Sequence, residues 1–295
     1  MNYVVTPCHS RPEYLKVWIE LVKKAEGASS LFYLFCLDHG FDPKYEDLIY
    51  EFPYECGITY MPEPTGLHLG KQSRNVLNGL ISAAQHSDDL VYYVEEDVFI
   101  GVDFFRWHKE IHKREKDIFC SIGTKSNNYQ YSVDGFTSHY FTTSEVDYQA
   151  LGNCFKKEVI LDYIYPHYND NYLFNPTGYC KRNFPLSIIG SNWTEQDGLI
   201  RRIMELNKLS VAYPCLPFAY HAGFYGYNRQ PQVMKKSYKE KLALIREVCF
   251  DKALMKKWQE GMGESYWKDS IPVELDLTFD SLRKMDVDKI NIQND

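Results

Sequence analysis

Residues 90–97 read Leu90-Val91-Tyr92-Tyr93-Val94-Glu95-Glu96-Asp97, an apolar run that passes directly into three acids. An unbroken run of apolar and aromatic residues, without polar alternation, is typical of a strand that is buried on both faces. Such strands occur in parallel sheets that helices cover on both sides. This segment therefore predicts an α/β protein with acids at the carboxyl end of a central strand.

The preceding sequence repeats the same pattern. Further strand-like runs lie at 3–6, 31–37 and 58–60, and apolar residues at helical spacing lie between them at 12–22 and 73–86. This alternation predicts a Rossmann-type, mostly parallel sheet flanked by helices. Ligands of such sheets gather beyond the carboxyl ends of the strands, where this chain places polar segments. These segments are Pro7 to Arg11, Asp38-His39 and Glu95 to Asp97.

The second half of the chain is less regular. Residues 116–190 are rich in Tyr, Asn, Ser and Thr, a helix is expected from Thr194 through Leu206, and a charged amphipathic helix is expected at about 238–260. With 295 residues, the chain is long enough for one large or two small domains. We expect one catalytic domain at 1–230, with a nucleotide half at 1–115 and an acceptor half at 116–230, and a C-terminal helical extension at 231–295.

Composition excludes several classes of protein. The chain has 33 basic and 40 acidic residues and no basic block, which disfavours a nucleic-acid backbone as the main partner, although a local basic groove is compatible with this total. The eight cysteines are scattered, so we expect reduced thiols and no zinc site.

No apolar run approaches the roughly 20 residues of a membrane span, and the N-terminus lacks signal-peptide features. We therefore expect a cytoplasmic protein without a membrane span.

Glu95 and Asp97 are the first candidates for chemistry. In a strand, side chains two residues apart point to the same side, so we expect Glu95 and Asp97 to face together. Two carboxylates that leave a buried strand together repel each other unless a cation joins them. Hard divalent ions such as Mn²⁺ or Mg²⁺ take oxygen ligands and often link protein carboxylates to phosphates. The alternative is a solvated acidic strand end.

These acids resemble the aspartate-x-aspartate motif of nucleotide-sugar glycosyltransferases of the GT-A fold, with Glu95 in the first position. Other segments follow in that family's order over about residues 1–230. The resemblance implies that the loop after the first strand and the Gly70 to Asn75 stretch bind the nucleotide, with Asp38 at the base or ribose. The nucleotide-binding residues implied in this way are Pro7, Ser10, Arg11, Asp38, Lys71, Arg74, Asn75 and Glu96.

A second cluster, Trp193 to Gly198, opens the helix expected from Thr194. In the inverting branch of the family, an acid at this place is the general base that deprotonates the acceptor hydroxyl. That role requires a carboxylate within hydrogen-bond reach of the nucleophile and a suitable pKa. The two acids are more often adjacent in the family, whereas Gln196 separates them here, so the resemblance leaves two candidates for the base. We favour Asp197, with Glu195 as the second choice. The alternative is that both acids only stabilise the helix start.

A third cluster runs from Tyr220 to Arg229 and combines one histidine with spaced glycines. It resembles the loop that supplies the family's third metal ligand, which implies His221 beside Asp97 and Glu95. A neutral imidazole is a suitable ligand for Mn²⁺. Arg229 is then expected to neutralise the leaving nucleotide, with Lys235 as the other cation. The alternative is a core histidine beside a turn.

Together these motifs predict a metal-dependent glycosyltransferase that moves a sugar from a nucleotide-diphosphate sugar, most simply a UDP-sugar, to an acceptor hydroxyl with inversion. A retaining enzyme would need no such base and stays open. A nucleotidyltransferase and a non-catalytic nucleotide- or sugar-binding protein are the alternatives. The acceptor is a saccharide, a protein side chain or a modified DNA base, which the aromatic-rich acceptor half could stack.

Overall fold

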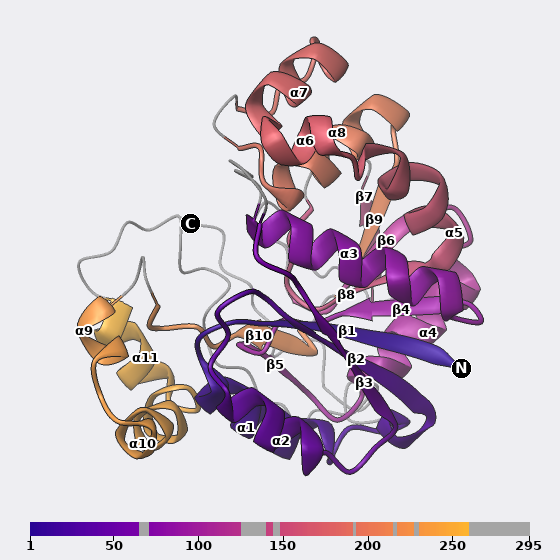
Figure 1. Cartoon of the computed structure of the whole chain (residues 1–295). Helices are drawn as coiled ribbons and strands as arrows, with labels where there is room; N and C mark the ends of the chain where they lie inside the picture. The colour runs from indigo at the N-terminus through magenta and orange to yellow at the C-terminus, as the bar shows by residue number, and fades with distance from the viewer. Residues whose placement is uncertain are drawn as a thin grey trace.

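The computed structural model describes residues 1–64, 71–124, 140–143, 148–190, 193–214, 217–226 and 230–259. Its strands are β1 (Asn2–Cys8), β2 (Leu31–Leu37), β3 (Cys56–Tyr60), β4 (Leu90–Tyr93), β5 (Val98–Ile100), β6 (Ile118–Ile122), β7 (Tyr140–Thr143), β8 (Asn153–Lys156), β9 (Ser210–Pro214) and β10 (Ala219–His221). Its α-helices are α1 (Pro12–Val22), α2 (Lys44–Tyr50), α3 (Lys71–His86), α4 (Phe104–Arg114), α5 (Lys157–Val159), α6 (Asp170–Phe174), α7 (Pro176–Asn183), α8 (Gln196–Asn207), α9 (Pro231–Met234), α10 (Tyr238–Val248) and α11 (Lys252–Gln259). Figure 1 shows their arrangement.

One large sheet organises the described part of the chain. It has eight strands in the order β3-β2-β1-β4-β8-β6-β9-β7, and β10 pairs with β5 in a separate two-stranded sheet. Neighbours β3, β2, β1 and β4 are parallel, as are β6 and β9, whereas β8 and β7 run antiparallel to their neighbours. The expected mostly parallel α/β sheet is confirmed, with two antiparallel strands inserted.

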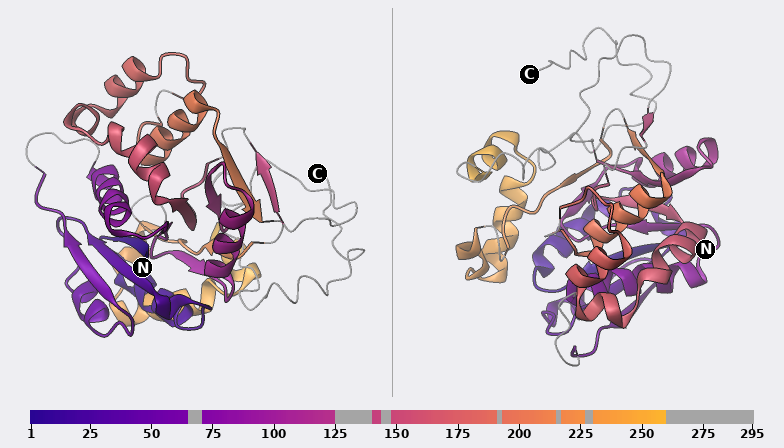
Figure 2. Two further views of the ribbon diagram at one scale, coloured as in Figure 1. Left: turned by 90° about the vertical axis from the view of Figure 1, so that its right-hand side faces the viewer. Right: turned by 90° about the horizontal axis from the view of Figure 1, so that it is seen from above.

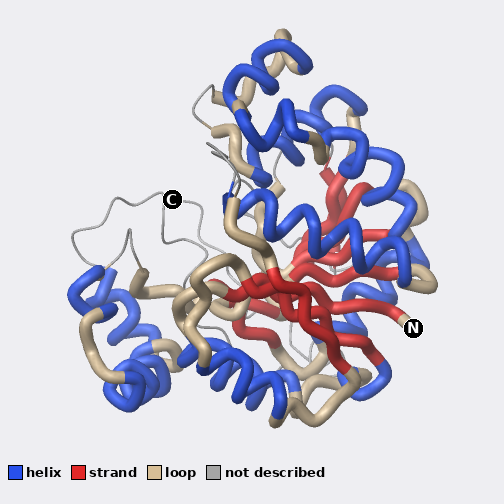
Figure 3. The backbone as a smooth tube through the Cα atoms, viewed as in Figure 1, coloured by secondary structure: helices blue, strands red, loops and turns tan. Residues whose placement is uncertain are grey.

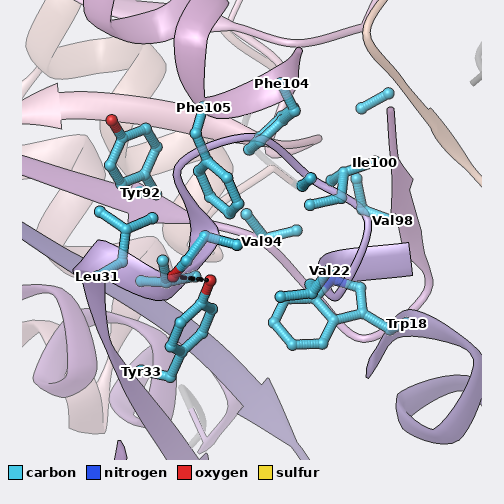
Figure 4. Close-up of a cluster of buried hydrophobic side chains, with 14 of the residues drawn as sticks. Trp18, Val22, Leu31, Tyr33, Tyr92, Val94, Val98, Ile100, Phe104 and Phe105 are labelled. Carbon is cyan, nitrogen blue, oxygen red and sulfur yellow. Dashed lines mark hydrogen bonds between the residues drawn. The ribbon is translucent and has the colours of Figure 1, made fainter. Parts of the chain in front are cut away.

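Helices cover both faces of this sheet (Figure 3). On one face, α1, α2 and α4 contribute to a buried apolar cluster that includes Trp18 and Phe105, and α3 and α8 contribute to a second cluster on the other face. Figure 4 shows the first cluster, where the Tyr33 hydroxyl donates to the carbonyl of Ala28 at 3.0 Å. Many of the chain's aromatic residues therefore lie in the core.

The C-terminal helices pack beside α1 rather than on the sheet (Figure 2). A third apolar cluster joins Tyr14 and Val17 of α1 to Ile245 and Val248 of α10. The single helix expected at 238–260 is wrong: α10 ends at Val248 and α11 begins at Lys252. Asp251 causes the break, because its carboxylate accepts hydrogen bonds from the backbone N–H groups of residues 253 and 254 and so starts a new helix.

Among the described helices, none combines the length and apolar character that a membrane crossing requires.

Candidate active site

A cleft of about 380 Å³ opens at the carboxyl ends of β1, β2 and β4. This is where the order of the strands predicted a ligand site, and the volume lies in the range of small-molecule pockets. The cleft is lined by Pro7, Cys8, His9, Ser10, Arg11, Asp38, Gln72, Asn75, Val76, Glu95, Glu96, Asp97, His221, Tyr225 and Gly226. Five separate regions of the chain thus meet at one edge of the sheet.

Asp97 and His221 face each other in this cleft, although they lie 124 residues apart in sequence. Antiparallel pairing of β5 with β10 places His221 opposite Val98, directly beside Asp97. The backbone N–H of Ala222 donates to the carbonyl of Asp97 at 2.7 Å, which holds the two segments together. As a result, Nε2 of His221 lies 3.2 Å from Oδ2 of Asp97, and the Asp97 side chain is only 2% exposed.

Arg11 brings a positive charge to the same acids. Its Nη1 lies 2.7 Å from Oδ2 of Asp97, and its Nη2 lies 3.1 Å from Oε1 of Glu96. Nη1 also donates to the carbonyl of Tyr225 at 3.3 Å. The backbone fixes the position of Arg11, because Pro12 begins α1 directly after it and its N–H donates to the Tyr45 hydroxyl at 2.9 Å.

Glu95 lines the same cleft as Asp97 and His221. The strand does not extend to these acids as expected, because β4 ends at Tyr93 and a turn follows, closed by a 3.0 Å hydrogen bond from the N–H of Val98 to the carbonyl of Glu95. The Glu95 carboxylate accepts a 2.5 Å hydrogen bond from the Tyr93 hydroxyl. The structure therefore brings all three expected metal ligands to one cleft, with Asp97 and His221 in direct contact and Glu95 held by Tyr93.

Burial sets the protonation of these acids. Burial, followed by the charges of neighbouring carboxylates that include Asp97 and Asp197, raises the pKa of Glu95 to about 8. Burial also raises the pKa of Glu96 to about 7, although the guanidinium of Arg11 opposes the shift. A cation that entered the cleft would lower both values, so the acids are poised to respond to one.

The donor set fits a divalent ion that takes most of its ligands from a substrate. Within the described residues, no three His, Cys, Asp or Glu side chains are grouped so that they could hold a metal by themselves. One carboxylate and one imidazole nevertheless meet beside Gly223, which has no side chain to separate them. A Cβ at Gly223 would clash with Oδ2 of Asp97 and lie 2.6 Å from Nε2 of His221. Mg²⁺ and Mn²⁺ are commonly held by few protein groups together with phosphate oxygens and water.

The base candidates lie at the start of α8, which α3 anchors. The Ser73 hydroxyl accepts from the backbone N–H of Gln196 at 2.9 Å and donates to its side-chain oxygen at 3.1 Å. Burial raises the pKa of Asp197 to about 6, with Arg201 lowering it and Glu195 raising it. Oδ1 of Asp197 is buried and has no hydrogen-bond partner among the described residues. Neither acid lines the cleft, but Asp197 is near enough to contribute to the raised pKa of Glu95.

Some of the other residues expected to bind the nucleotide line the cleft, and others do not. Most of them line the cleft, and Asn75 is fixed there by a 3.0 Å hydrogen bond from its Nδ2 to the carbonyl of Cys36. Arg74 does not line the cleft, because its guanidinium donates to the carbonyl of Pro62. Lys71 begins α3, but its side chain lies outside the described residues, as does the whole of Arg229.

Several residues that line the cleft were not singled out individually from the sequence: Cys8, His9, Gln72, Val76, Tyr225 and Gly226. All of them except Val76 lie inside the segments 7–11, 70–75 and 220–229, which the motifs had already assigned to the site. Asn75 and Val76 follow Gln72 by three and four residues on α3, so helical spacing from Gln72 predicts that they share its face.

No protein-family model matches the chain, and no curated protein matches its sequence. Among solved structures, TarS 1-349 from S. aureus in complex with UDP-GlcNAc is 11% identical, with a TM-score of 0.47 over 90% of this chain and 69% of that chain. The mannosyltransferase PcManGT from Pyrobaculum calidifontis, in complex with GDP-Man and Mn²⁺, is 10% identical, with a TM-score of 0.40 over 54% of this chain and 45% of that chain. A cytidylyltransferase from Leptospira borgpetersenii is 9% identical, with a TM-score of 0.36 over 62% of this chain and 71% of that chain.

These likenesses include glycosyltransferases, the class that the sequence motifs resemble, and one enzyme of the rival class. The match spans less than half of the mannosyltransferase chain. All three TM-scores are below 0.5, so these likenesses do not assign a function to this chain. Its function is inferred from the geometry of the cleft.

Proposed function

We propose that this protein is a glycosyltransferase that uses a divalent ion, Mn²⁺ or Mg²⁺, to move a sugar from a nucleotide-diphosphate sugar to an acceptor hydroxyl. The observation that supports this most directly is the pair of Asp97 and His221 at the carboxyl end of the sheet. The pair lies beside the guanidinium of Arg11 and against Gly223, whose missing side chain allows the close approach. A diphosphate needs this combination of cation ligands and a fixed positive charge.

In this proposal Asp97 and His221 hold the ion, and Arg11 is the protein's own cation for the diphosphate. A divalent ion bound there neutralises the charge that develops on the leaving nucleotide. Asp38 and Asn75 line the cleft on the side of β2 and α3, and we assign them to the nucleoside, for which UDP is the first candidate. Pro7 and Ser10 shape the loop between these groups.

Asp197 is the proposed general base. It would accept the proton of the acceptor hydroxyl while that oxygen attacks the anomeric carbon, which inverts the configuration there. A pKa near 6 suits this role, because the carboxylate is mostly ionised at neutral pH yet remains a competent base. Glu195 is the second choice, since its side chain is exposed at the helix start.

One sequence feature argues against the nearest rival. Nucleotidyltransferases usually carry a glycine-rich loop after the first strand, whereas residues 7–12 read Pro-Cys-His-Ser-Arg-Pro here. The acceptor remains a saccharide, a protein or a modified nucleobase in this proposal, and the acceptor half is assigned to residues 116–230.

The test is a thermal-shift panel of UDP-, GDP- and dTDP-sugars with and without Mn²⁺, on the wild-type protein and on Asp97→Asn. Asp103→Asn is the matched control, since Asp103 is also 2% exposed and also pairs with an arginine, but lies outside the cleft. We expect a metal-dependent shift with one nucleotide in the wild type and the control, and none in Asp97→Asn.

Turnover then separates the candidate functions. Release of a nucleoside diphosphate from the selected sugar nucleotide supports glycosyl transfer. Release of pyrophosphate from a nucleoside triphosphate and a sugar phosphate would instead establish the nucleotidyltransferase. Binding without either product would leave a binding protein.

A further inference from the structure

A buried ion pair links the C-terminal helices to the first helix of the α/β core. Nζ of Lys241 in α10 lies 2.5 Å from Oε1 of Glu13 in α1, and the two side chains are 9% and 1% exposed. Lysine and glutamate are almost never this buried unless they are paired. The pair lies outside the cleft that the proposed function uses.

The second oxygen of Glu13 connects this pair to the cleft. The Tyr225 hydroxyl donates to Oε2 of Glu13 at 3.1 Å, so both carboxylate oxygens are engaged. Tyr225 lines the cleft, and its backbone carbonyl accepts from Nη1 of Arg11. A continuous set of polar contacts therefore runs from Lys241 to the guanidinium that pairs with Asp97.

Aromatic packing keeps Tyr225 in this orientation. Its ring stacks on Tyr14 with the ring centroids 5.0 Å apart, and the Tyr14 hydroxyl accepts from the backbone N–H of Phe224 at 3.0 Å. The carbon Cζ of Arg11 lies 5.3 Å from the centre of the Tyr14 ring. Movement of Tyr225 would thus disturb the contacts of Arg11 directly.

Holding α10 against α1 does not require buried charges. The apolar cluster of Val17, Ile245 and Val248 already joins these helices, and they share a second ion pair at the surface, Arg246 with Glu20 at 2.6 Å. A well-packed apolar pair often replaces a buried ion pair without loss of stability. The charges of Glu13 and Lys241 are therefore not needed to pack α10 against α1, and they have a more specific role.

We propose that Glu13 and Lys241 are positioning residues that hold Tyr225, and through it Arg11, at the cleft. The C-terminal helical extension is then part of the nucleotide site rather than an appendage to it. The expected effect of these residues on nucleotide binding rests on the proposed function. Their expected effect on the position of Tyr225 does not. Figure 1 shows α10 beside α1, where the pair is made.

The experiment compares Lys241→Met with Arg246→Met, which removes the surface ion pair between the same two helices. The first readout needs no ligand: hydrogen–deuterium exchange of the backbone at 222–226, measured by mass spectrometry. We expect exchange there to rise at least tenfold in Lys241→Met and to stay at the wild-type rate in Arg246→Met. Unchanged exchange in a folded Lys241→Met protein would overturn the inference.

The second readout is the dissociation constant of UDP in the presence of Mn²⁺, measured by calorimetry. We expect binding at least tenfold weaker in Lys241→Met and partial recovery in Lys241→Arg. If Lys241→Met does not fold, the double variant Glu13→Gln with Lys241→Met removes both charges and takes its place. Faster exchange with weaker binding in the folded double variant supports positioning, and wild-type values of both overturn it.

The two proposals fail separately. A wild-type protein that binds no nucleotide sugar and no nucleotide overturns the proposed function, while the exchange data still decide whether Lys241 fixes the segment at Tyr225. Wild-type nucleotide affinity in Lys241→Met overturns the inference and leaves the proposed function intact.

Discussion

Replacing Gly223 with alanine tests whether a ligand depends on the close approach of Asp97 and His221. The added methyl group would clash with Oδ2 of Asp97 and lie 2.6 Å from Nε2 of His221, so at least one of the two side chains must rotate away. Overfilling a packed site typically costs about 1–3 kcal/mol. If that cost falls on the bound state, the affinity for Mn²⁺ with a nucleotide drops by about 5- to 150-fold.

The assay is calorimetry of UDP binding at fixed Mn²⁺, with circular dichroism to establish that the variant folds. Gly226→Ala is the matched control: Gly226 lines the same cleft, but its Cβ would meet only Nη1 of Arg11, at an ordinary 3.8 Å. We expect the control to bind like the wild type. Wild-type affinity in Gly223→Ala would refute the reasoning, because it would mean that the ligand does not depend on this arrangement of Asp97 and His221.

Three further predictions follow from the same contacts. Arg11→Met removes the guanidinium that pairs with Asp97 and leaves that buried carboxylate without this partner, so the free energy of unfolding at neutral pH should fall by about 3 kcal/mol. Urea unfolding measures this change, and an unchanged midpoint would contradict the prediction. Because burial raises the pKa of Asp197 to about 6, kcat/KM should rise with pH through about 6 as this carboxylate ionises. Asp197→Asn should abolish turnover, whereas Glu195→Gln should retain it. The reverse result would assign the role of base to Glu195. Gly79→Ala places a methyl group 2.8 Å from a Val5 methyl of β1, so it should destabilise the fold by about 1–3 kcal/mol in thermal unfolding. Nucleotide affinity should not change. A wild-type melting temperature would contradict this prediction, because it would show that the interface between α3 and the sheet relaxes.

Local pattern was sufficient to predict the parallel half of the sheet. The runs at β1, β2 and β4 are apolar because both faces are covered, and this property is visible in a single sequence. The placement of Asp38 and Asp97 near one another followed from strand direction alone.

The contact between Asp97 and His221 could not be derived from periodicity. It depends on two strands of three residues each, β5 and β10, which are too short to carry a repeating pattern. Resemblance to a family suggested His221, and tertiary pairing put it in place. The strand was expected to reach Glu95 and Asp97, but it ends at Tyr93, so the alternation of side chains along a strand does not apply to these acids.

The separation of Asp97 from its partners along the chain has a consequence for biosynthesis. At translation rates of about 5–20 residues per second, roughly 7–29 seconds pass between synthesis of Asp97 and synthesis of Lys241. At the start of that interval β1, β2 and β4 are complete, whereas His221 of β10 and Lys241 of α10 are added only near its end. A nascent chain therefore carries the acids of the cleft well before it carries the residues that the fold places around them. Under the proposed function and the proposed role of Lys241, binding of a nucleotide and a metal ion begins only once α10 has been made.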